Sequence, residues 1–183
     1  MNQALILIDI QNNYFPGGAN PLVGSGEASQ NAQKVLQHFR IRGLPVIHVQ
    51  HLSVRPGSTF FIPGTTGADI HRNVAPVAGE TLITKNFPNS FRETGLMELL
   101  KDLRVTGLVV CGMMTHMCID TTVRAATDLG FQIELIADAC ATKDLEYDGV
   151  QVRADDVHRS FLAAMDGVFA TVTTTSRFLS SNH

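Results

Sequence analysis

The stretch LVVCGMMTHMCIDTTVRAATDL, from Leu108 to Leu129, decides how this chain is expected to fold. Its first residues, 108–111, form an apolar run of the kind that a strand buried on both faces produces. Gly112 interrupts the run, and residues 118–129 have the pattern of a helix that ends before Gly130. A buried strand joined to a helix by a short turn is the repeating unit of a parallel α/β sheet.

Cys118 lies at the start of this expected helix, just past the carboxyl end of the strand. The free N–H groups and the positive dipole end of a helix N-terminus favour thiolate over thiol. The same N–H groups could hold the oxyanion that forms when the sulfur attacks a carbonyl. Most cysteines, however, are buried packing residues, so the role of nucleophile also requires a base and a cation nearby.

Length and composition narrow the class of protein. A chain of 183 residues predicts one domain over 1–183 with a proper core. The net charge of −3 provides no basic field, so we expect no nucleic-acid partner. No apolar run approaches the length of a membrane span and the N-terminus has no basic signal-peptide start, which together predict a cytoplasmic protein that does not enter a membrane.

The three cysteines, Cys111, Cys118 and Cys140, contain no Cys-x-x-Cys pair and do not predict a disulfide framework. A zinc site made of Cys111, His116 and Cys118 would have suitable ligand types. Its spacing matches no common zinc motif, and Cys111 would lie inside a strand.

The remaining apolar segments predict the rest of the sheet. We expect further strands over residues 4–10, 45–51, 81–85, 132–137 and 168–173, and further helices over 27–42, 95–103 and 154–165. Strict alternation of strand and helix predicts a three-layer, doubly wound α/β fold with a mainly parallel, six-stranded, Rossmann-like sheet. The segment 52–79 shows no regular periodicity, and loops of that length in compact domains are often functional.

Asp9, Lys85 and Cys118 lie at or just past the carboxyl ends of three different expected strands. Ligands of open parallel sheets bind at that edge, so the three side chains can converge there. Taken singly, Asp9 is equally well explained as a loop cap and Lys85 as a solvated cation. Taken together, they predict covalent catalysis. Lys85 would favour the thiolate, Asp9 would move the thiol proton to a leaving amine, and water would hydrolyse the thioester.

The stretches that carry these residues resemble the three signature regions of the isochorismatase-like cysteine hydrolases. They are ALILIDIQNNYF from residue 4, TLITKNFPNSF from residue 81 and LVVCGMMTHMCIDTTVRAA from residue 108. The family includes nicotinamidases and N-carbamoylsarcosine amidase. The stretches FIPGTTGADIH and AMDGVFATV extend the resemblance over nearly the whole chain.

The resemblance implies a Rossmann-like, isochorismatase-type fold with Asp9 as proton shuttle, Lys85 as its partner and Cys118 as nucleophile. It also implies a non-proline cis peptide bond between Met113 and Met114, and an oxyanion hole made by the backbone N–H groups of Met114 and Cys118. Members are commonly dimers or tetramers, which implies a homo-oligomer in which a neighbouring subunit can contribute to the pocket.

Departures from the family pattern bear on the substrate. Nicotinamidases carry an Asp-x-His metal motif after the second strand, where this chain has Gln50-His51-Leu52-Ser53, so we expect no metal and no cofactor. Cys118 favours hydrolysis of a small amide or carbamoyl compound, because isochorismatases that cleave a vinyl ether lack the cysteine. Vinyl ether hydrolysis and a redox-sensing or ligand-binding module remain as alternatives. The candidates for the pocket wall are Phe15, His51, Phe60, Phe87 and His116.

Overall fold

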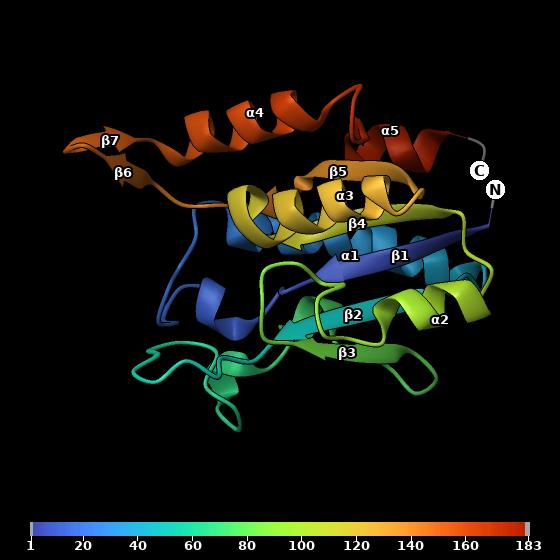
Figure 1. Ribbon diagram of the computed structural model, residues 1–183, viewed down its shortest axis with the longest axis horizontal. Helices are drawn as coiled ribbons and strands as arrows, with labels where there is room; N and C mark the ends of the chain where they lie inside the picture. Colours follow the sequence, from blue (N-terminus) through green and yellow to red (C-terminus); the bar gives the residue numbers. More distant parts are fainter. Residues whose placement is uncertain (1, 182–183) are drawn as a thin grey trace.

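The computed structural model describes residues 2–181, over which six strands form one sheet with helices on both sides (Figure 1). The strands are β1 (Gln3–Ile8), β2 (Val46–His51), β3 (Thr81–Lys85), β4 (Gly107–Met113), β5 (Gln132–Ala141) and β8 (Thr171–Thr173). They lie in the order β3-β2-β1-β4-β5-β8, and every neighbouring pair is parallel. The six-stranded α/β sheet predicted from the apolar runs is therefore confirmed.

The close pairing of β1 with β4 at the centre of the sheet depends on Gly112. Ile8 pairs with Gly112 in the register of the two strands, and Gly112 has a φ of +137°. A Cβ atom at this position would lie 2.0 Å from the carbonyl oxygen of Ile8. Gly112 therefore does not end the strand, as the sequence suggested, but lets β4 continue to Met113 against β1.

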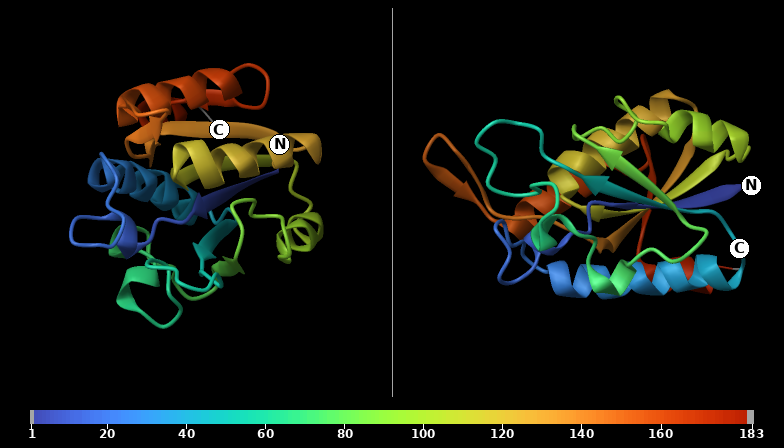
Figure 2. Two further views of the ribbon diagram at one scale, coloured as in Figure 1. Left: turned by 60° about the vertical axis from the view of Figure 1, so that its left-hand side comes forward. Right: turned by 90° about the horizontal axis from the view of Figure 1, so that it is seen from below.

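The helices form the two outer layers. Helices α1 (Ser25–Ile41) and α5 (Thr175–Ser180) cover one face, and α2 (Leu96–Asp102) and α3 (Asp120–Asp128) cover the other (Figure 2). Helix α4 (Ala154–Met165) packs on the same side as α3. None of the helices in the described part of the chain has the length and apolar character needed to cross a membrane.

The structure contains two elements that the sequence analysis missed. Strands β6 (Leu145–Tyr147) and β7 (Val150–Val152) form an antiparallel hairpin that projects beyond the N-terminal end of α4 (Figure 1). The hairpin lies between the strand expected over 132–137 and the helix expected over 154–165, where no element was predicted. Helix α5 follows the last expected strand, 168–173, in a stretch where no element was predicted either. The last sheet strand is also shorter than the predicted 168–173, since β8 spans three residues.

The segment 52–79 contains no long element, as its lack of periodicity predicted. It includes two 3-10 turns, η2 (Thr66–Ala68) and η3 (Arg72–Val74), and it packs against a third, η1 (Asn12–Tyr14), which follows β1. The N–H group of Asn12 donates to the carbonyl of Asp69 at 3.0 Å. The loops that follow β1 and β2 thus form one layer over the carboxyl edge of the sheet.

Candidate active site

Asp9, Lys85 and Cys118 meet at the carboxyl edge of the sheet. The Nζ atom of Lys85, the last residue of β3, lies 2.7 Å from Asp9 Oδ2 and 3.2 Å from Cys118 Sγ. Asp9 follows β1 and Cys118 follows β4, and the strand order diverges between these two central strands. Such a switch point is where open α/β sheets bind ligands. All three side chains are buried, with exposures of 0%, 1% and 5% for Asp9, Lys85 and Cys118.

The backbone at Asp9 turns sharply away from β1. Its φ is +53°, a left-handed conformation that is uncommon for residues other than glycine, although Asp adopts it more readily than most. The N–H of Asp9 still donates to Val49 in β2, whereas its carbonyl accepts from Gln11. This turn ends β1 at Ile8, earlier than predicted, and brings the Asp9 carboxylate to the Lys85 ammonium.

Cys118 lies in a π-helical turn, Thr115–Ile119, that continues directly into α3. The sequence analysis expected Cys118 in the first turn of a regular α-helix. Single π turns within helices are often found at functional sites. The peptide bond between Met113 and Met114, immediately before this turn, is cis. The Thr115 hydroxyl ties the turn to α4, because it hydrogen-bonds to His158 Nδ1 at 2.8 Å.

Lys85 is surrounded by acceptors. Besides its contact with Asp9, its Nζ donates to Cys118 Sγ, to His51 Nδ1 at 3.1 Å and to the carbonyl of Phe87 at 3.1 Å. Burial alone would lower the pKa of Lys85, but the charge of Asp9 opposes this effect, and the pKa of Lys85 lies above its ordinary value. Lys85 is therefore an ammonium at neutral pH.

The Asp9 carboxylate is held by charge rather than by directed hydrogen bonds. Although Oδ2 forms the short ion pair with Lys85, neither carboxylate oxygen accepts a well-aligned hydrogen bond from another described residue. Buried carboxylate oxygens that accept no hydrogen bond are rare in folded proteins. The Asp9 carboxylate therefore keeps acceptor capacity that no described residue uses.

The resting state of Cys118 differs from the sequence-based expectation. Burial raises the pKa of the Cys118 thiol, Asp9 raises it further, and Lys85 only partly opposes the two. A raised pKa favours the protonated thiol at neutral pH, whereas the sequence analysis expected Lys85 and the helix terminus to favour the thiolate. That prediction counted the helix terminus and the lysine but not the loss of solvent around the sulfur.

Two of the five predicted wall residues contact the cluster directly. His51 accepts from Lys85 and lies 3.8 Å from Asp9 Oδ2. Burial lowers the pKa of His51, and the nearby charge of Lys85 also lowers it, against an opposing effect of Asp9, so the imidazole is neutral and can accept that hydrogen bond. Phe87 contributes its carbonyl group to Lys85, while its ring lies 3.6 Å beneath the Arg92 guanidinium.

The other three predicted wall residues lie around the cluster without a direct contact to it. Phe60 packs on Tyr14 with ring centroids 6.3 Å apart. Phe15 stacks on His71 at 3.7 Å and borders a cavity of about 650 Å³. His116 follows the cis peptide and lies 2.5 Å from Thr142 Oγ1 through its Nδ1 atom.

The loop after β1 holds residues that the sequence analysis did not single out. The Gln11 amide donates to the His51 carbonyl and accepts from the His51 N–H, at 2.9 and 2.8 Å. Asn13 accepts from the N–H of Phe61 at 2.7 Å, and Tyr14 packs edge-on against that ring. Burial is the main cause that raises the pKa of Tyr14, and the charge of Asp9 contributes to the same shift. Irregular loops have no periodicity from which such buried polar residues could be recognised.

Within residues 2–181, one set of side chains has ligand atoms close enough together to hold a metal ion. These atoms of Asp9, His51 and Cys118 lie within 4.8 Å of one another. The Lys85 ammonium, however, contacts all three groups, so a positive charge already lies among them. The trio of Cys111, His116 and Cys118 considered as a zinc site does not form such a group in residues 2–181.

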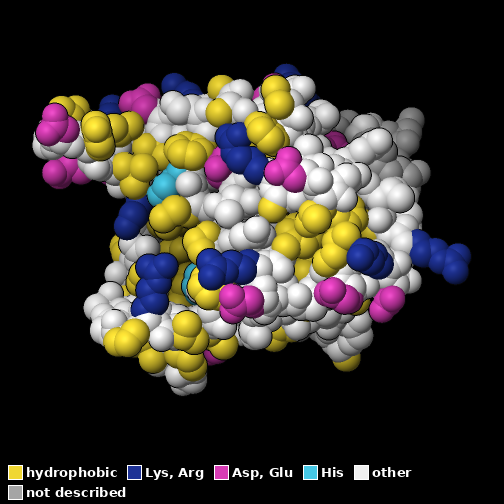
Figure 3. Space-filling model, in the orientation of Figure 1, with side chains coloured by type: hydrophobic (Ala, Val, Ile, Leu, Met, Phe, Trp, Pro, Cys, Tyr) yellow, Lys and Arg dark blue, Asp and Glu magenta, His cyan; other side chains and the backbone are white. Residues whose placement is uncertain are grey.

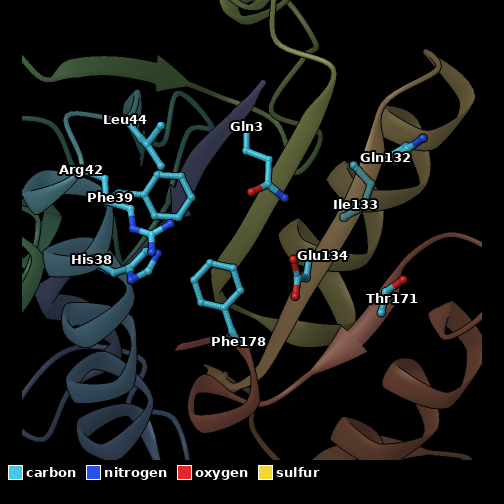
Figure 4. A pocket seen from close by; sticks show the side chains of 10 residues that line it. All are labelled: Gln3, His38, Phe39, Arg42, Leu44, Gln132, Ile133, Glu134, Thr171 and Phe178. Carbon is cyan, nitrogen blue, oxygen red and sulfur yellow. The ribbon is translucent and has the colours of Figure 1, made fainter. Parts of the chain in front are cut away.

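The structure also contains a cavity of about 680 Å³ at the opposite edge of the sheet (Figure 4). Gln3 at the start of β1, Phe39 of α1, and Gln132 and Glu134 of β5 contribute to its lining. Because β1 is six residues long, this cavity lies about 20 Å from the carboxyl edge. Its lining contains none of Asp9, Lys85 and Cys118, so this cavity is separate from the cluster at the carboxyl edge.

Comparison with known proteins identifies the family. Residues 3–177 match the isochorismatase domain. The uncharacterized isochorismatase family protein YddQ of Bacillus subtilis is 50% identical over 98% of this chain and 99% of its own length. A streptothricin hydrolase of Streptomyces noursei is 34% identical over 78% of this chain and 51% of its own. The crystal structure of an isochorismatase from Pseudomonas putida has a TM-score of 0.90 at 36% identity, covering 96% of this chain and 89% of that one. The chain therefore belongs to the isochorismatase family of hydrolases.

Proposed function

We propose that this protein is a cysteine-dependent hydrolase of a small amide or carbamoyl compound that forms a thioester at Cys118. The observation that carries the proposal is the Lys85 ammonium, in contact with both a carboxylate and a thiol in a buried site. A cysteine nucleophile needs a base that takes its proton and a cation that compensates the charge, and Asp9 and Lys85 can supply these two functions. Similarity to a streptothricin hydrolase supports hydrolytic chemistry.

In the first half-reaction, Asp9 takes the proton of Cys118 as the sulfur attacks the substrate carbonyl. The new C–S bond displaces the carbonyl π electrons onto oxygen, and the N–H groups of Met114 and Cys118 stabilise the oxyanion. The oxyanion then collapses, the C–N bond breaks, and Asp9 returns its proton to the departing amine.

In the second half-reaction, water replaces the amine. Asp9 accepts a proton from the water, whose oxygen attacks the thioester carbonyl, and the proton passes to the departing sulfur of Cys118. Lys85 remains an ammonium throughout and keeps Asp9 from being an isolated buried charge in the steps where it is ionised. Proton transfer by a placed side chain contributes roughly 10²- to 10⁴-fold to such reactions.

A high thiol pKa fits this order of events. A protonated Cys118 gives up its proton only when the sulfur attacks, so the base and the nucleophile must act together. The same property weakens the redox-sensor alternative, because oxidation of cysteine proceeds through the thiolate.

The test is a screen of small amides and carbamoyl compounds for ammonia release, with Cys118→Ala as the control. We expect a substrate whose turnover requires Cys118 and whose acyl group appears on that residue. Lys85→Ala should suppress the adduct. A stable sulfenate with no acyl adduct would instead support the redox module, and product from a vinyl ether without any adduct would support the ether hydrolase.

We also propose that the protein is a homo-oligomer, a dimer or tetramer, assembled through the β6–β7 hairpin. Tyr147 and Val150 on this hairpin are 83% and 65% exposed. A two-stranded ribbon is marginally stable alone in water, and exposed apolar side chains on a projection favour a partner. Sedimentation velocity of the wild type and of a Tyr147→Ser, Val150→Ser variant tests this, and a monomeric wild type would contradict it.

A further inference from the structure

Three cations lie on segments that leave the carboxyl edge of the sheet, the edge that holds the candidate active site. Arg55 follows β2, Arg92 follows β3 and Lys143 follows β5, so each lies beyond the carboxyl end of a strand. Figure 3 shows Lys and Arg side chains grouped around a hollow at the left of the view, the side toward which the strand arrows point in Figure 1. Hydrophobic and His side chains are visible within this hollow. We refer to Arg55, Arg92 and Lys143 as the basic rim.

Each rim cation is linked to a residue beside the catalytic cluster. The charge of Arg55 acts on His51, which accepts from Lys85, and the charge of Lys143 acts on His116. Arg92 lies 3.6 Å above the ring of Phe87, whose carbonyl accepts from Lys85. Because the three cations approach from three different strands, their fields add at the entrance between them.

Nearby acids do not cancel the rim. Glu93 lies 3.5 Å from Arg92, but both side chains are more than half exposed, and such pairs are weak. Asp120 is bound to Arg124 at 2.8 Å, and Asp144 accepts from the N–H of Ala154 at the start of α4.

The two other rim cations have no acidic partner. Lys143 donates to the neutral amide of Asn20, and Arg55 forms no ion pair with another described residue. This local positive charge occurs on a chain whose net charge is −3, so it does not follow from composition.

We propose that the substrate carries a carboxylate or similar anionic group beside its scissile amide or carbamoyl group, and that the basic rim attracts and holds that charge. The identity of the reaction rests on the proposed function, whereas the preference for negative charge rests on the rim alone. Guanidinium groups match carboxylates with paired hydrogen bonds, and two of the three rim residues are arginines. Converging cations at a low-dielectric entrance also raise the local concentration of anions.

The test compares alkylation of Cys118 by iodoacetate and by iodoacetamide, two reagents of similar size that differ in charge. In both reactions the sulfur forms a C–S bond, iodide leaves and the thiol proton is released. Because the thiolate fraction enters both rates equally, their ratio reports the charge of the entrance. All three cysteines are buried, so a Cys118→Ser variant is needed to show how much of the labelling belongs to Cys118 and how much to Cys111 and Cys140.

The iodoacetate-to-iodoacetamide rate ratio should exceed that of a small neutral thiol, and it should fall as salt is added. Arg55→Gln, Arg92→Gln and Lys143→Gln should each lower the ratio by about two- to threefold, as expected for unit charges about 8 Å apart in a water-like dielectric. Lys101→Gln, in α2 near the opposite edge, removes the same charge and should leave the ratio unchanged.

A ratio equal to that of the free thiol, or unchanged in the triple rim variant, would overturn the proposal. Failure of both reagents to label Cys118 would overturn it too, since the rim would then not border an entrance. Formation of an acyl adduct on Cys118 does not depend on this ratio. If acyl adducts form but the rate ratio is the same in the rim variants, the proposed amidase activity is supported and the preference for negative charge is refuted. If the ratio depends on the rim but no adduct forms, the charge preference is supported and the amidase activity is refuted.

Discussion

At the residue scale, the site depends on Lys85, because one ammonium serves Asp9, Cys118, His51 and the Phe87 carbonyl together. Its placement could be predicted, since the end of an apolar strand can be read from the sequence and parallel strands share one carboxyl edge. The residues that align His51, Gln11 above all, could not be predicted. Their hydrogen bonds join loops 40 residues apart, and no spacing rule describes such contacts.

Replacing Lys85 with Met should destabilise the fold, because it leaves the Asp9 carboxylate buried without a counter-charge. Breaking one side of a buried ion pair costs about 3–5 kcal/mol. Urea denaturation measures the loss, and the double variant Asp9→Asn, Lys85→Met should recover part of it, since neither charge is then left alone. Equal stability of the single variant and the wild type would show that the pair is not buried as described.

The pH dependence of Cys118 alkylation should follow its raised pKa. Because burial and Asp9 raise the pKa of the thiol, the rate with iodoacetamide should still be rising with pH at values where an ordinary surface thiol has levelled off. Asp9→Asn removes the charge that raises the pKa and should move the curve to lower pH. A rate that levels off below neutral pH in the wild type would indicate a resting thiolate and contradict the proposed order of proton transfer.

At the element scale, the sheet was predictable and the short peripheral elements were missed for different reasons. The central strands are continuous apolar runs, whereas α5 has six residues and no amphipathic repeat. The β6–β7 hairpin did carry a signal. Asp148 and Gly149 both have positive φ, as a tight hairpin turn requires, and Asp-Gly is a favoured sequence for such turns. No hydrophobic periodicity or capping pattern distinguishes the π-helical turn at Cys118 from a regular helix start, so the sequence did not predict it.

Gly112→Ala should disturb the site through the sheet. The added Cβ would meet the Ile8 carbonyl at 2.0 Å, so β1 and β4 would have to separate just before Asp9 and Cys118. We expect a loss of at least about 2 kcal/mol in unfolding free energy, from overpacking and from the positive φ. Gly26→Ala in α1, where nothing lies within 4 Å, is the matched control and should be neutral or slightly stabilising. Equal effects in the two variants, measured by urea midpoints, would refute the role given to Gly112.

At the scale of the whole molecule, charge is distributed unevenly in a way that composition cannot show. The net charge of −3 gives no reason to expect a nucleic-acid partner, yet Arg55, Arg92 and Lys143 all follow strands that end at the edge of the candidate active site. These residues are far apart in sequence and lie at the same edge only because β2, β3 and β5 all end there. Sequence reasoning found the cluster at that edge but not the charge around it.

A second cluster links the layers and should govern acid stability. Glu80 binds Arg40 of α1 at 2.6 Å and His48 of β2 at 2.8 Å, and the hydrogen bond from Arg40 is the main cause that lowers the pKa of Glu80 to about 2. A carboxyl with a depressed pKa stabilises the fold above its unfolded pKa of roughly 4.3, and that stability is lost as the pH falls toward 2. The difference in Tm between the wild type and Glu80→Gln should therefore be largest at neutral pH and shrink below about pH 4. A constant difference down to pH 2 would assign the effect to packing instead.

The central claim, a covalent bond between the substrate acyl group and Cys118, can be measured directly. The enzyme is mixed with a turned-over amide, quenched in acid within the first turnovers, and examined by peptide mass spectrometry. The account predicts an acyl mass on the peptide that contains Cys118, its disappearance once substrate is exhausted, and no ammonia release by Cys118→Ala. Full turnover by Cys118→Ala, or sustained ammonia release with the Cys118 peptide unmodified at every time point, would contradict it.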